Sequence, residues 1–414
     1  MNRRGLLVAL LIWLALSVAP ALGQVKVSVT LNRIDYLVGE PIFVIVEATN
    51  TGTEAVGYSK LDGRNDLKVP AGQRKQVPNL HGCPNYSLAG GGFGGGIDHP
   101  PLLAPGKSVS FRYLLEGYRL QPGDYELHAS GKAGVRWFFG MGRGRSSVSN
   151  KKQGDPVEGA TFDVRLSFSV SQGTEDDLKA RYAPLVQQSQ SGSGMFGPGW
   201  EAREAIAEMA PPFLEKTILG FAHLPWSGRF AAKGLGQIDT STSRADLVEL
   251  YEHSVDLQLR ADIVEALAGI ATSAELPFLA SLIPGHSGIY DDRIRIWAIL
   301  GVGRVGGEKA VEILKSAPRS PTDEVRHTVV TALGNTRSKT AIPVLIEMYA
   351  DETVRYRVCD ALSTLTHRAW CDGTHSVAGA QVLWQGWFKD NQSTLKVYGN
   401  DQCVERKELA PLAN

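Results

Sequence analysis

Two histidines and one cysteine recur every four residues near the C-terminal end of the sequence. The segment THRAWCDGTH contains His367, Cys371 and His375. On a continuous helix these side chains would line one face and could hold zinc, which binds imidazole and thiolate. Gly373 and the loop-like composition around it argue against a continuous helix. The sequence therefore predicts no metal site here and favours a disulfide between Cys371 and Cys403 that ties down the tail.

A glycine-rich segment, SLAGGGFGGGIDHPP, raises the question of phosphate binding. The segment lacks the Gly-Lys-Ser or Gly-Lys-Thr ending of a phosphate-binding loop, and it opens no predicted helix. Four flanking residues could hold a metal, but their His-x-Cys spacing is not that of a common structural zinc site. They are His81, Cys83, Asp98 and His99. We expect a loop without a bound cofactor.

No pattern of catalytic residues stands out along the chain. The sequence has no His-Glu-x-x-His, no Gly-x-Ser-x-Gly and no nucleotide-binding fingerprint, and its nine histidines form no obvious set of base and orienting groups. With 43 basic and 43 acidic residues, the chain has no net charge that would attract nucleic acid. We therefore expect a protein that is not an enzyme, needs no cofactor and binds no nucleic acid.

The first residues have the pattern of an export signal. Arg3 and Arg4 precede the uncharged run GLLVALLIWLALSVA, and small residues in PALGQ follow it. We expect a signal peptide over residues 1–23, cleavage near Gly23, and a periplasmic or secreted chain with no integral membrane span. An uncleaved anchor is the alternative, because the run is long for a signal core. In an oxidising compartment the four cysteines allow up to two disulfides.

The first half of the chain alternates apolar and polar residues with period two. Segments such as VKVSVTL, FVIVEA and TFDVRLSFSV predict strands, and clusters such as QPGD predict the turns between them. About seven short strands over residues 24–173 fit two antiparallel sheets packed face to face. LQPGDYELHA resembles the corner of immunoglobulin-like sandwiches, with Tyr125 as the corner tyrosine. This half resembles the immunoglobulin-like modules common in exported bacterial proteins.

One loop of this half places aromatic residues beside cations. The segment VRWFFGMGRGRSSVSNKK includes Arg136, Trp137, Phe138 and Phe139 near the expected last hairpin. Such a mixture suits a contact surface. The alternative is that the aromatic side chains pack into the sandwich and only the basic tip is solvated.

The second half repeats a helical pattern. Four segments, QLRADIVEALAGI, RIRIWAILGVGRV, EVRHTVVTALGNT and TVRYRVCDALSTL, align on arginines spaced by 35, 31 and 29 residues. These are Arg260, Arg295, Arg326 and Arg355. Apolar residues at offsets 0, 4, 7 and 8 trace one helix face, and Cys359 falls in a further apolar column, where we expect a small buried residue. An aspartate three or four residues before each arginine is expected to cap the helix or pair with the arginine.

Each unit adds a second short amphipathic helix, and such a pair cannot bury its apolar face alone, so neighbouring pairs must stack. The pattern resembles HEAT-like repeats, including those of phycobilin-lyase-type proteins, over residues 200–370. The expected architecture is a β-sandwich followed by an α-α superhelix.

We expect a lead-in helix and flexible joint over 174–199, and a capping segment and tail over 371–414. In the capping segment, GAQVLWQGWFKDN places Trp384, Trp387 and Phe388 on one face.

In HEAT-like stacks one helix of each pair lines the concave side, and the resemblance assigns that place to the arginine-bearing helix. Its residues outside the apolar columns are therefore candidates for binding. They are Ile296, Trp297, Leu300, His327, Tyr356 and Arg357. The alternative is that another part of the chain covers Trp297.

These features favour an exported, non-catalytic binding or scaffold protein whose concave face holds a protein or peptide. One alternative is a structural component of the envelope held by the basic aromatic loop. Another is a lyase-type enzyme, by analogy with the phycobilin-lyase type, although no cysteine or histidine here matches a motif for that chemistry.

Overall fold

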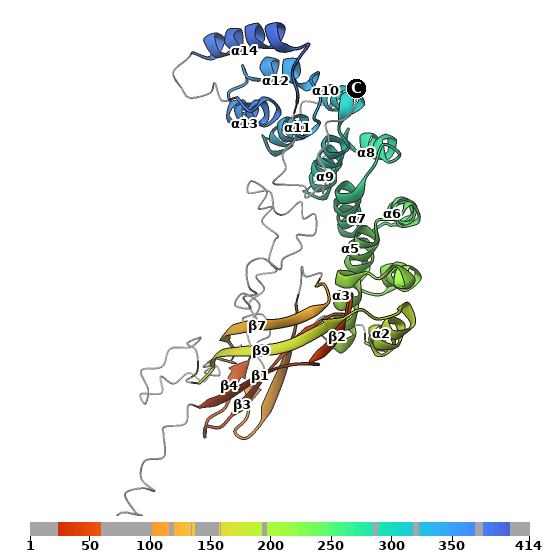
Figure 1. The fold of residues 1–414 in the computed structure, drawn as a ribbon, viewed down its shortest axis with the longest axis vertical. Coiled ribbons are helices and arrows are strands. Elements are labelled where there is room, and N and C mark those ends of the chain that lie inside the picture. The colour runs from red at the N-terminus through yellow and green to blue at the C-terminus, as the bar shows by residue number, and fades with distance from the viewer. Residues whose placement is uncertain are drawn as a thin grey trace, which may run out of the picture. The chain divides into compact units, whose positions relative to one another are not determined.

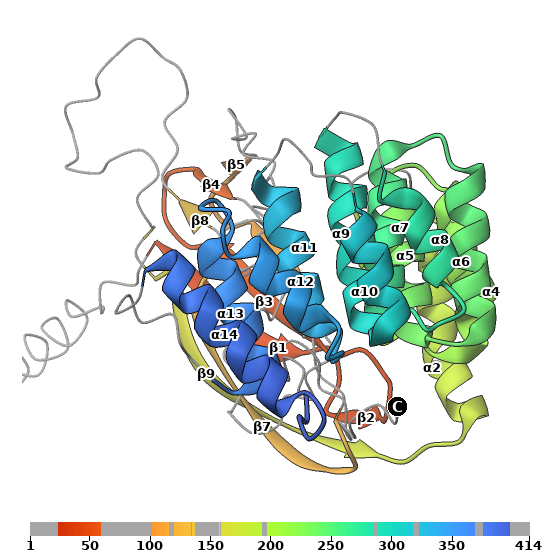
Figure 2. The ribbon, with the colours of Figure 1, turned by 90° about the horizontal axis from the view of Figure 1, so that it is seen from above.

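The protein divides into two compact units, with the boundary between Ala180 and Arg181. The first unit consists of strands and the second of helices, as predicted (Figures 1 and 2). The computed structural model describes residues 24–58, 102–115, 120–133, 135–136, 157, 159–192, 197–284, 289–317, 323–368 and 376–397.

The first unit contains three sheets of three strands each within its described residues, where two sheets were expected. The strands are β1 (Val25–Leu31), β2 (Asp35–Leu37), β3 (Phe43–Asn50), β4 (Val56–Tyr58), β5 (Leu102–Leu103), β6 (Ser108–Leu114), β7 (Gly123–Lys132), β8 (Val135–Arg136) and β9 (Thr161–Ser171). Their order is β1-β3-β6, β2-β9-β7 and β5-β4-β8; β2 runs parallel to β9, and the other pairs are antiparallel. Side chains from all three sheets, such as Val46, Leu127 and Val135, share one core.

The predicted corner tyrosine makes a local hydrogen bond at the start of β7. The hydroxyl of Tyr125 donates to the backbone oxygen of Gln121 at 2.6 Å. Its ring stacks on Phe168, with centroids 5.5 Å apart, and Phe168 meets Tyr36 edge to face. The turn before β7 is thereby fixed to the core of the sheet that contains β9.

Several sequence predictions fall on residues outside the described part of the chain. These are the signal segment 1–23, the glycine-rich segment with its flanking His81, Cys83, Asp98 and His99, the loop residues Trp137, Phe138 and Phe139, and the pair Cys371 and Cys403. Of Arg136 only the backbone is described, and it pairs with Gly57 between β8 and β4.

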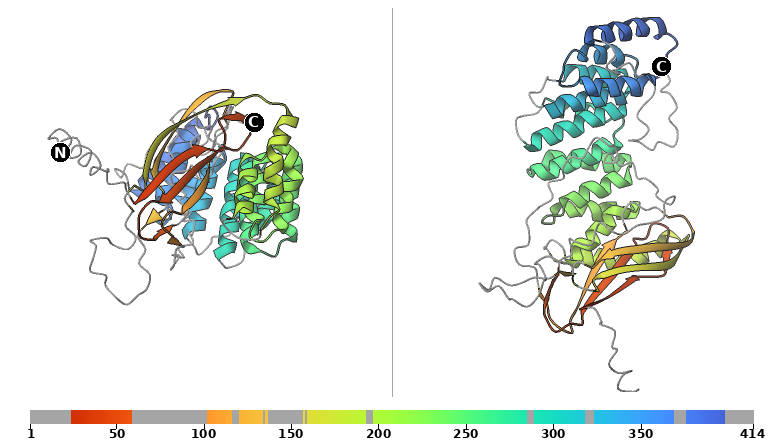
Figure 3. Two further views of the ribbon diagram at one scale, coloured as in Figure 1. Left: turned by 90° about the horizontal axis from the view of Figure 1, so that it is seen from below. Right: turned by 90° about the vertical axis from the view of Figure 1, so that its left-hand side faces the viewer.

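The second unit is a stack of helices in two layers (Figure 3). The inner layer consists of α3, α5, α7, α9, α11 and α13, each of which contacts the next. Figure 1 shows the inner helices from α5 onward on the concave side of the stack. The outer helices pack behind them. The bounds are α2 (Glu175–Ser189), α3 (Pro198–Met209), η3 (Pro212–Leu214), α4 (Glu215–Gly220), η4 (Phe221–His223), α5 (Gly228–Ile238), α6 (Ser241–His253), α7 (Leu257–Ile270), α8 (Leu276–Leu282), α9 (Ile289–Val305), α10 (Gly307–Ser316), α11 (Asp323–Asn335), α12 (Ala341–Met348), α13 (Arg355–Thr366) and α14 (Val377–Asn391). Among the described helices, none is long and apolar enough to cross a bilayer.

Neighbouring inner helices approach each other where a glycine faces an alanine. A Cβ atom added to Gly303 on α9 would lie only 2.7 Å from the Cα atom of Ala332 on α11, closer than real Cβ atoms come. The same arrangement recurs at every junction of the inner layer. The facing pairs are Gly234 with Ala207, Gly236 with Ala266, Gly301 with Ala268, Gly303 with Ala332, and Gly334 with Ala361. The small residues therefore set how closely the backbones pack.

The aligned arginines connect the two layers. In three repeats the arginine Nε donates to a backbone oxygen in the last turn or at the C-cap of the preceding outer helix, at 3.0 to 3.2 Å. Such carbonyl groups have no partner within their own helix, so the arginine satisfies them. The pairs are Arg260 with Tyr251, Arg295 with Ile283, and Arg355 with Tyr349.

The predicted aspartate caps are confirmed in part. Asp256 caps α7, because its carboxylate accepts from the backbone NH groups of the two residues at 258 and 259. Asp351 accepts from the NH of Thr353 at 3.0 Å and lies 3.5 Å from the guanidinium of Arg326 on the previous inner helix. In α9 the carboxylate 3.5 Å from the aligned arginine belongs to Asp292.

The last helix, α14, packs against the outer helix α12. The side chain of Gln381 donates to the backbone oxygen of Ile346 at 2.8 Å, and Trp384 is fully buried. The ring of Trp384 meets Trp387 edge to face at 5.9 Å, and Phe388 is half-buried. The aromatic face of the segment is thus turned toward the protein.

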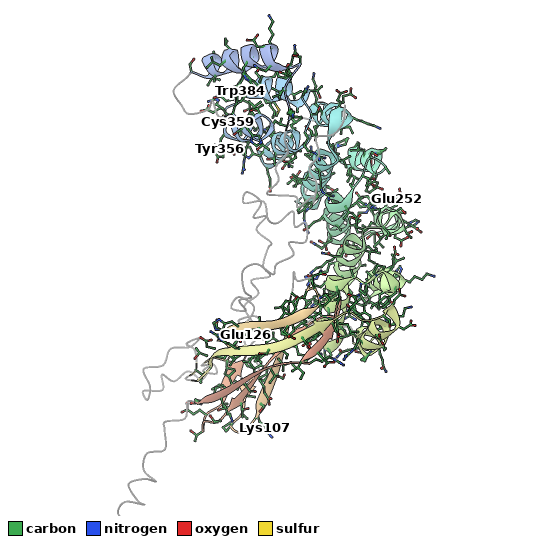
Figure 4. The ribbon with its side chains drawn as sticks, viewed as in Figure 1. Lys107, Glu126, Glu252, Tyr356, Cys359 and Trp384 are labelled. Carbon is green, nitrogen blue, oxygen red and sulfur yellow. The ribbon has the colours of Figure 1, made fainter. Side chains whose placement is uncertain are left out.

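The prediction that Cys359 acts as a small buried apolar residue is wrong. Cys359 lies on α13, is half-buried and is disulfide-bonded (Figure 4). Its column is apolar in the other repeats, so periodicity alone could not distinguish a cystine from an apolar side chain.

Replacing Gly303 by alanine should destabilise the helical unit. The added methyl group must push α9 away from α11, and such overpacking costs about 1–3 kcal/mol. Thermal unfolding followed by circular dichroism at the helix signal measures the change. Gly386→Ala on α14 is the matched control, because a Cβ there meets nothing within 4 Å. The control should gain about 0.5–1 kcal/mol from the better helix former. Equal effects of the two changes would contradict the packing role of Gly303.

Candidate binding surface

Three of the predicted binding residues belong to the core of the helical stack. Ile296, Trp297 and Leu300 are 2%, 1% and 7% exposed, so the prediction that they form an accessible patch is wrong. The reason is the position of α9, which is flanked by α7 and α11 and backed by α8 and α10. Every residue of α9 from Ile294 to Gly303 is buried as a result.

Tyr356 is the exposed aromatic side chain of the predicted set. It lies on α13, the last helix of the inner layer, and its side chain is 70% exposed (Figure 4). The guanidinium of Arg357 lies 6.0 Å from the ring centroid, at the limit of a cation–π contact. One turn on, partial burial raises the pKa of Asp360 and Arg357 lowers it in part. An aromatic ring, a cation and a carboxylate therefore lie together on one helix.

His327 connects α11 to the segment that enters α13. Its Nε2 lies 2.7 Å from the backbone oxygen of Thr353, and because a carbonyl oxygen only accepts, Nε2 carries the hydrogen. The ion pair between Arg326 and Asp351 spans the same junction. His327 therefore fixes α11 to the segment that precedes α13, the helix that carries Tyr356.

A three-residue ionic cluster joins α7 to α9, and the sequence analysis missed it. The guanidinium of Arg293 lies 2.9 Å from the carboxylate of Asp262 and 2.7 Å from that of Glu265. Burial raises the pKa of Asp262; Arg293 lowers it in part and Glu265 raises it further. Burial alone would lower the pKa of Arg293, but the two carboxylates raise it above its ordinary value. The i, i+3 spacing of the two carboxylates on α7 was the available signal.

The polar side chains of the inner layer therefore serve two purposes. Arg293, Arg326 and His327 hold adjacent repeats together, while Tyr356 and Arg357 remain partly or largely accessible. Among the described residues, no group of three His, Cys, Asp or Glu side chains is placed to hold a metal ion. Exposed aromatic and arginine side chains are typical of protein-binding surfaces.

Comparisons with known proteins support the repeat architecture. A family model described as HEAT repeats matches residues 289–366, from the start of α9 to the end of α13. No curated protein matches the chain. The part of the chain from α9 to α13 therefore consists of HEAT-like repeats, which suggest interaction with other proteins.

Two solved structures are similar at low sequence identity. One is human deoxyhypusine hydroxylase in complex with glycerol, at 15% identity and a TM-score of 0.26, covering 52% of this chain and 98% of that one. The other is the complex of CpcE and CpcF of phycocyanin lyase from Nostoc sp. PCC7120, at 14% identity and a TM-score of 0.29, covering 51% of this chain and 82% of that one. At these TM-scores neither structure bears on the activity of this chain, and the expectation that it is not an enzyme stays a prediction.

Replacing Arg293 by methionine should destabilise the helical unit in a pH-dependent way. Folding raises the pKa of Asp262 above its ordinary value of 3.8, mainly because the carboxyl group is buried. The folded state therefore favours the protonated form, and the contribution of Asp262 to stability falls as the pH rises. Without the arginine, two neighbouring carboxylates lose their shared cation. The variant should lose about 1–3 kcal/mol at pH 7 and clearly less at pH 4.

Urea unfolding of the variant and the wild type at both pH values measures this difference. Arg165→Met, which removes the exposed ion pair with Glu126 on β7 and β9, is the control and should change stability by at most about 0.5 kcal/mol. An equal loss for Arg293→Met at pH 4 and pH 7 would show that the guanidinium contributes through packing alone.

Proposed function

We propose that this protein is an exported binding or scaffold protein that holds a protein or peptide partner on the concave side of its helical stack. The observation that carries the proposal is the exposure of Tyr356, at 70%, on an inner helix within the HEAT-like part of the chain. Tyrosine and arginine are enriched among the few residues that carry most of the binding energy at protein interfaces. Arg357 adds the second of these residue types.

The polar groups of the inner layer favour binding over catalysis. Arg293 contacts two carboxylates and His327 donates to a backbone oxygen, so both are occupied in holding the repeats together. Each therefore has partners that account for its position without a catalytic role. A non-catalytic role without a cofactor and without nucleic acid is therefore part of the proposal.

Two further features support the export of the chain. The N-terminal unit is proposed to be an immunoglobulin-like module, and the hydrogen bond from Tyr125 to Gln121 has the geometry of the corner in such domains. Cys359 is disulfide-bonded, and disulfides persist in oxidising compartments. Together with the leader-like segment at residues 1–23, these features favour a periplasmic or secreted location.

Replacing Tyr356 by serine should abolish capture of the partner. We expect full-length protein, immobilised and incubated with native envelope extract, to retain a protein that the variant does not retain. Loss of an aromatic anchor of this kind weakens binding by about 2 kcal/mol or more, or at least about thirtyfold. Because the side chain is exposed, the melting temperature should stay the same.

Val382→Ser is the matched control, since Val382 on α14 is 66% exposed and lies in the outer layer. The control should capture the partner like the wild type. Equal capture by all three proteins, or a lower melting temperature of Tyr356→Ser, would contradict a binding role for the concave surface.

Export makes a separate prediction about the mature chain. Expressed with its own N-terminus in a bacterial host, the protein should accumulate in the periplasmic fraction. Its intact mass should equal that of a chain that begins near Gln24. The mass should rise by about two hydrogen atoms for each disulfide that reduction opens. A chain that keeps residues 1–23 and stays with the membranes would support the uncleaved anchor instead.

A further inference from the structure

A disulfide lies where the inner layer ends. On α7, α9 and α11 a small residue faces the next inner helix, as Gly303 faces Ala332, and the residue four positions before it is fully buried. These buried residues are Val264, Ile299 and Val330. Residues four apart share a helix face, so each of them is turned toward the next inner helix. Cys359 holds the same place on α13, four positions before Ser363, and α13 is the last of the inner helices described.

The bonded partner of Cys359 is one of three residues. The chain contains four cysteines, and the other three are Cys83, Cys371 and Cys403. All three lie outside the described part of the chain, but the described helices on either side of Cys371 restrict the path between them. The directions of α12, α13 and α14 therefore help to distinguish the candidates.

The last helix, α14, runs in roughly the same direction as α13. Near the start of α14, Gln381 donates to the backbone oxygen of Ile346, close to the end of α12. At the other end, the backbone oxygen of Gln392 accepts from the ammonium group of Lys339, which precedes α12. Helix α14 is therefore antiparallel to α12. Since α13 follows α12 through a short turn and packs against it, those two helices are antiparallel as well.

The connection that contains Cys371 must therefore return along α13. The guanidinium of Arg368, directly after α13, lies 5.3 Å from the ring centroid of Trp387 near the end of α14. The start of α14 lies about 15 Å back along the helix from that ring. Cys359 lies about 10 Å back from the end of α13, and the four residues after His367 can span up to about 14 Å. Cys371 can therefore reach the level of Cys359.

The other two cysteines fit this position less well. Cys403 follows Gln392, which lies about 7 Å beyond Trp387 along α14 and so farther from Cys359. Cys83 belongs to the segment between β4 and β5. A bond from Cys83 would close a much longer loop, which costs more chain entropy than the short loop that ends at Cys371. Chain direction and loop length both favour Cys371.

We propose that Cys359 and Cys371 form a disulfide that closes the free end of the inner layer, in the place where an earlier repeat has its next inner helix. The bond fixes the connection before α14 to α13 and so holds the helix that carries Tyr356. This pairing replaces the one between Cys371 and Cys403 that the sequence favoured. It needs no partner at Tyr356, so it goes beyond the proposed function and is tested independently of it.

Peptide mapping of the full chain tests the pairing directly. An added leader directs the chain to the periplasm of a bacterial host, so that the test does not depend on residues 1–23. The protein is treated with N-ethylmaleimide and digested without reduction. Because trypsin cleaves after Arg368 and Lys396, the last three cysteines fall on different peptides. Mass spectrometry should find the Cys359 peptide linked to the Cys371 peptide. A link from Cys359 to either other cysteine, or a maleimide on Cys359, would overturn the proposal.

Two serine variants separate the proposed pair from the other cysteines. Cys371→Ser should leave Cys359 open to the maleimide and lower the melting temperature by about 5–10 °C, because the unfolded chain is no longer restricted by the bond. Cys403→Ser is the matched control and should keep Cys359 linked and unlabelled. The reverse result, with Cys359 labelled only in Cys403→Ser, would identify Cys403 as the partner and overturn the proposal.

Reduction of the folded wild type gives a second readout that needs no variant. Dithiothreitol opens a disulfide by exchange: its two thiols become a cyclic disulfide, and the two cysteines become thiols. The amides of α13 should then exchange with deuterium at least about tenfold faster, while those of α7 keep their rates. Unchanged exchange in α13, or an equal increase in both helices, would show that the bond does not hold α13 and would overturn its role beside Tyr356.

Discussion

The close approach of neighbouring inner helices is the constraint on which the helical unit depends. Each junction brings a glycine against an alanine, and the backbones pack at a distance that no larger side chain allows. Since each described inner helix contacts mainly its neighbours and the outer helices behind it, the stability of the stack depends on these local junctions. The stability of the unit is therefore the sum of similar local contacts.

The polar residues of the repeats reinforce those contacts. Three of the four aligned arginines donate to carbonyl oxygens at the ends of the outer helices, so α7, α9 and α13 are each fixed to the helix before them. Arg293 and His327 act between successive inner helices. Because these groups hold the architecture, the surfaces left for recognition are the ones the architecture does not use. Tyr356 on the concave side belongs to such a surface.

The architecture was predictable because it is repetitive. Columns of apolar residues located the helices from α7 to α13 and predicted buried positions such as Ile263, Leu267 and Val330 correctly. A repeated pattern averages over four helices, so a single irregular residue does not obscure it. The strands of the first unit followed from period-two alternation, but their division into three small sheets depends on long-range pairing that alternation does not contain.

The candidate surfaces were harder to predict, since each depends on what surrounds one residue. Trp297 departs from the polar residues of its column and was assigned to the surface, although α9 is enclosed on all sides. Arg293 lies outside the aligned columns, and its two carboxylate partners are on another helix.

On α5, α7, α9 and α11 the two small residues that form these junctions lie two positions apart, and they face opposite neighbours. The second small residue of one helix always meets the first of the following helix, so the junction has the same form wherever it occurs. A duplicated or deleted unit would meet its new neighbours through matching surfaces, without redesign of either side. Descendants of such a gene can therefore lengthen or shorten the array by whole modules, and natural selection can adjust its reach independently of its chemistry.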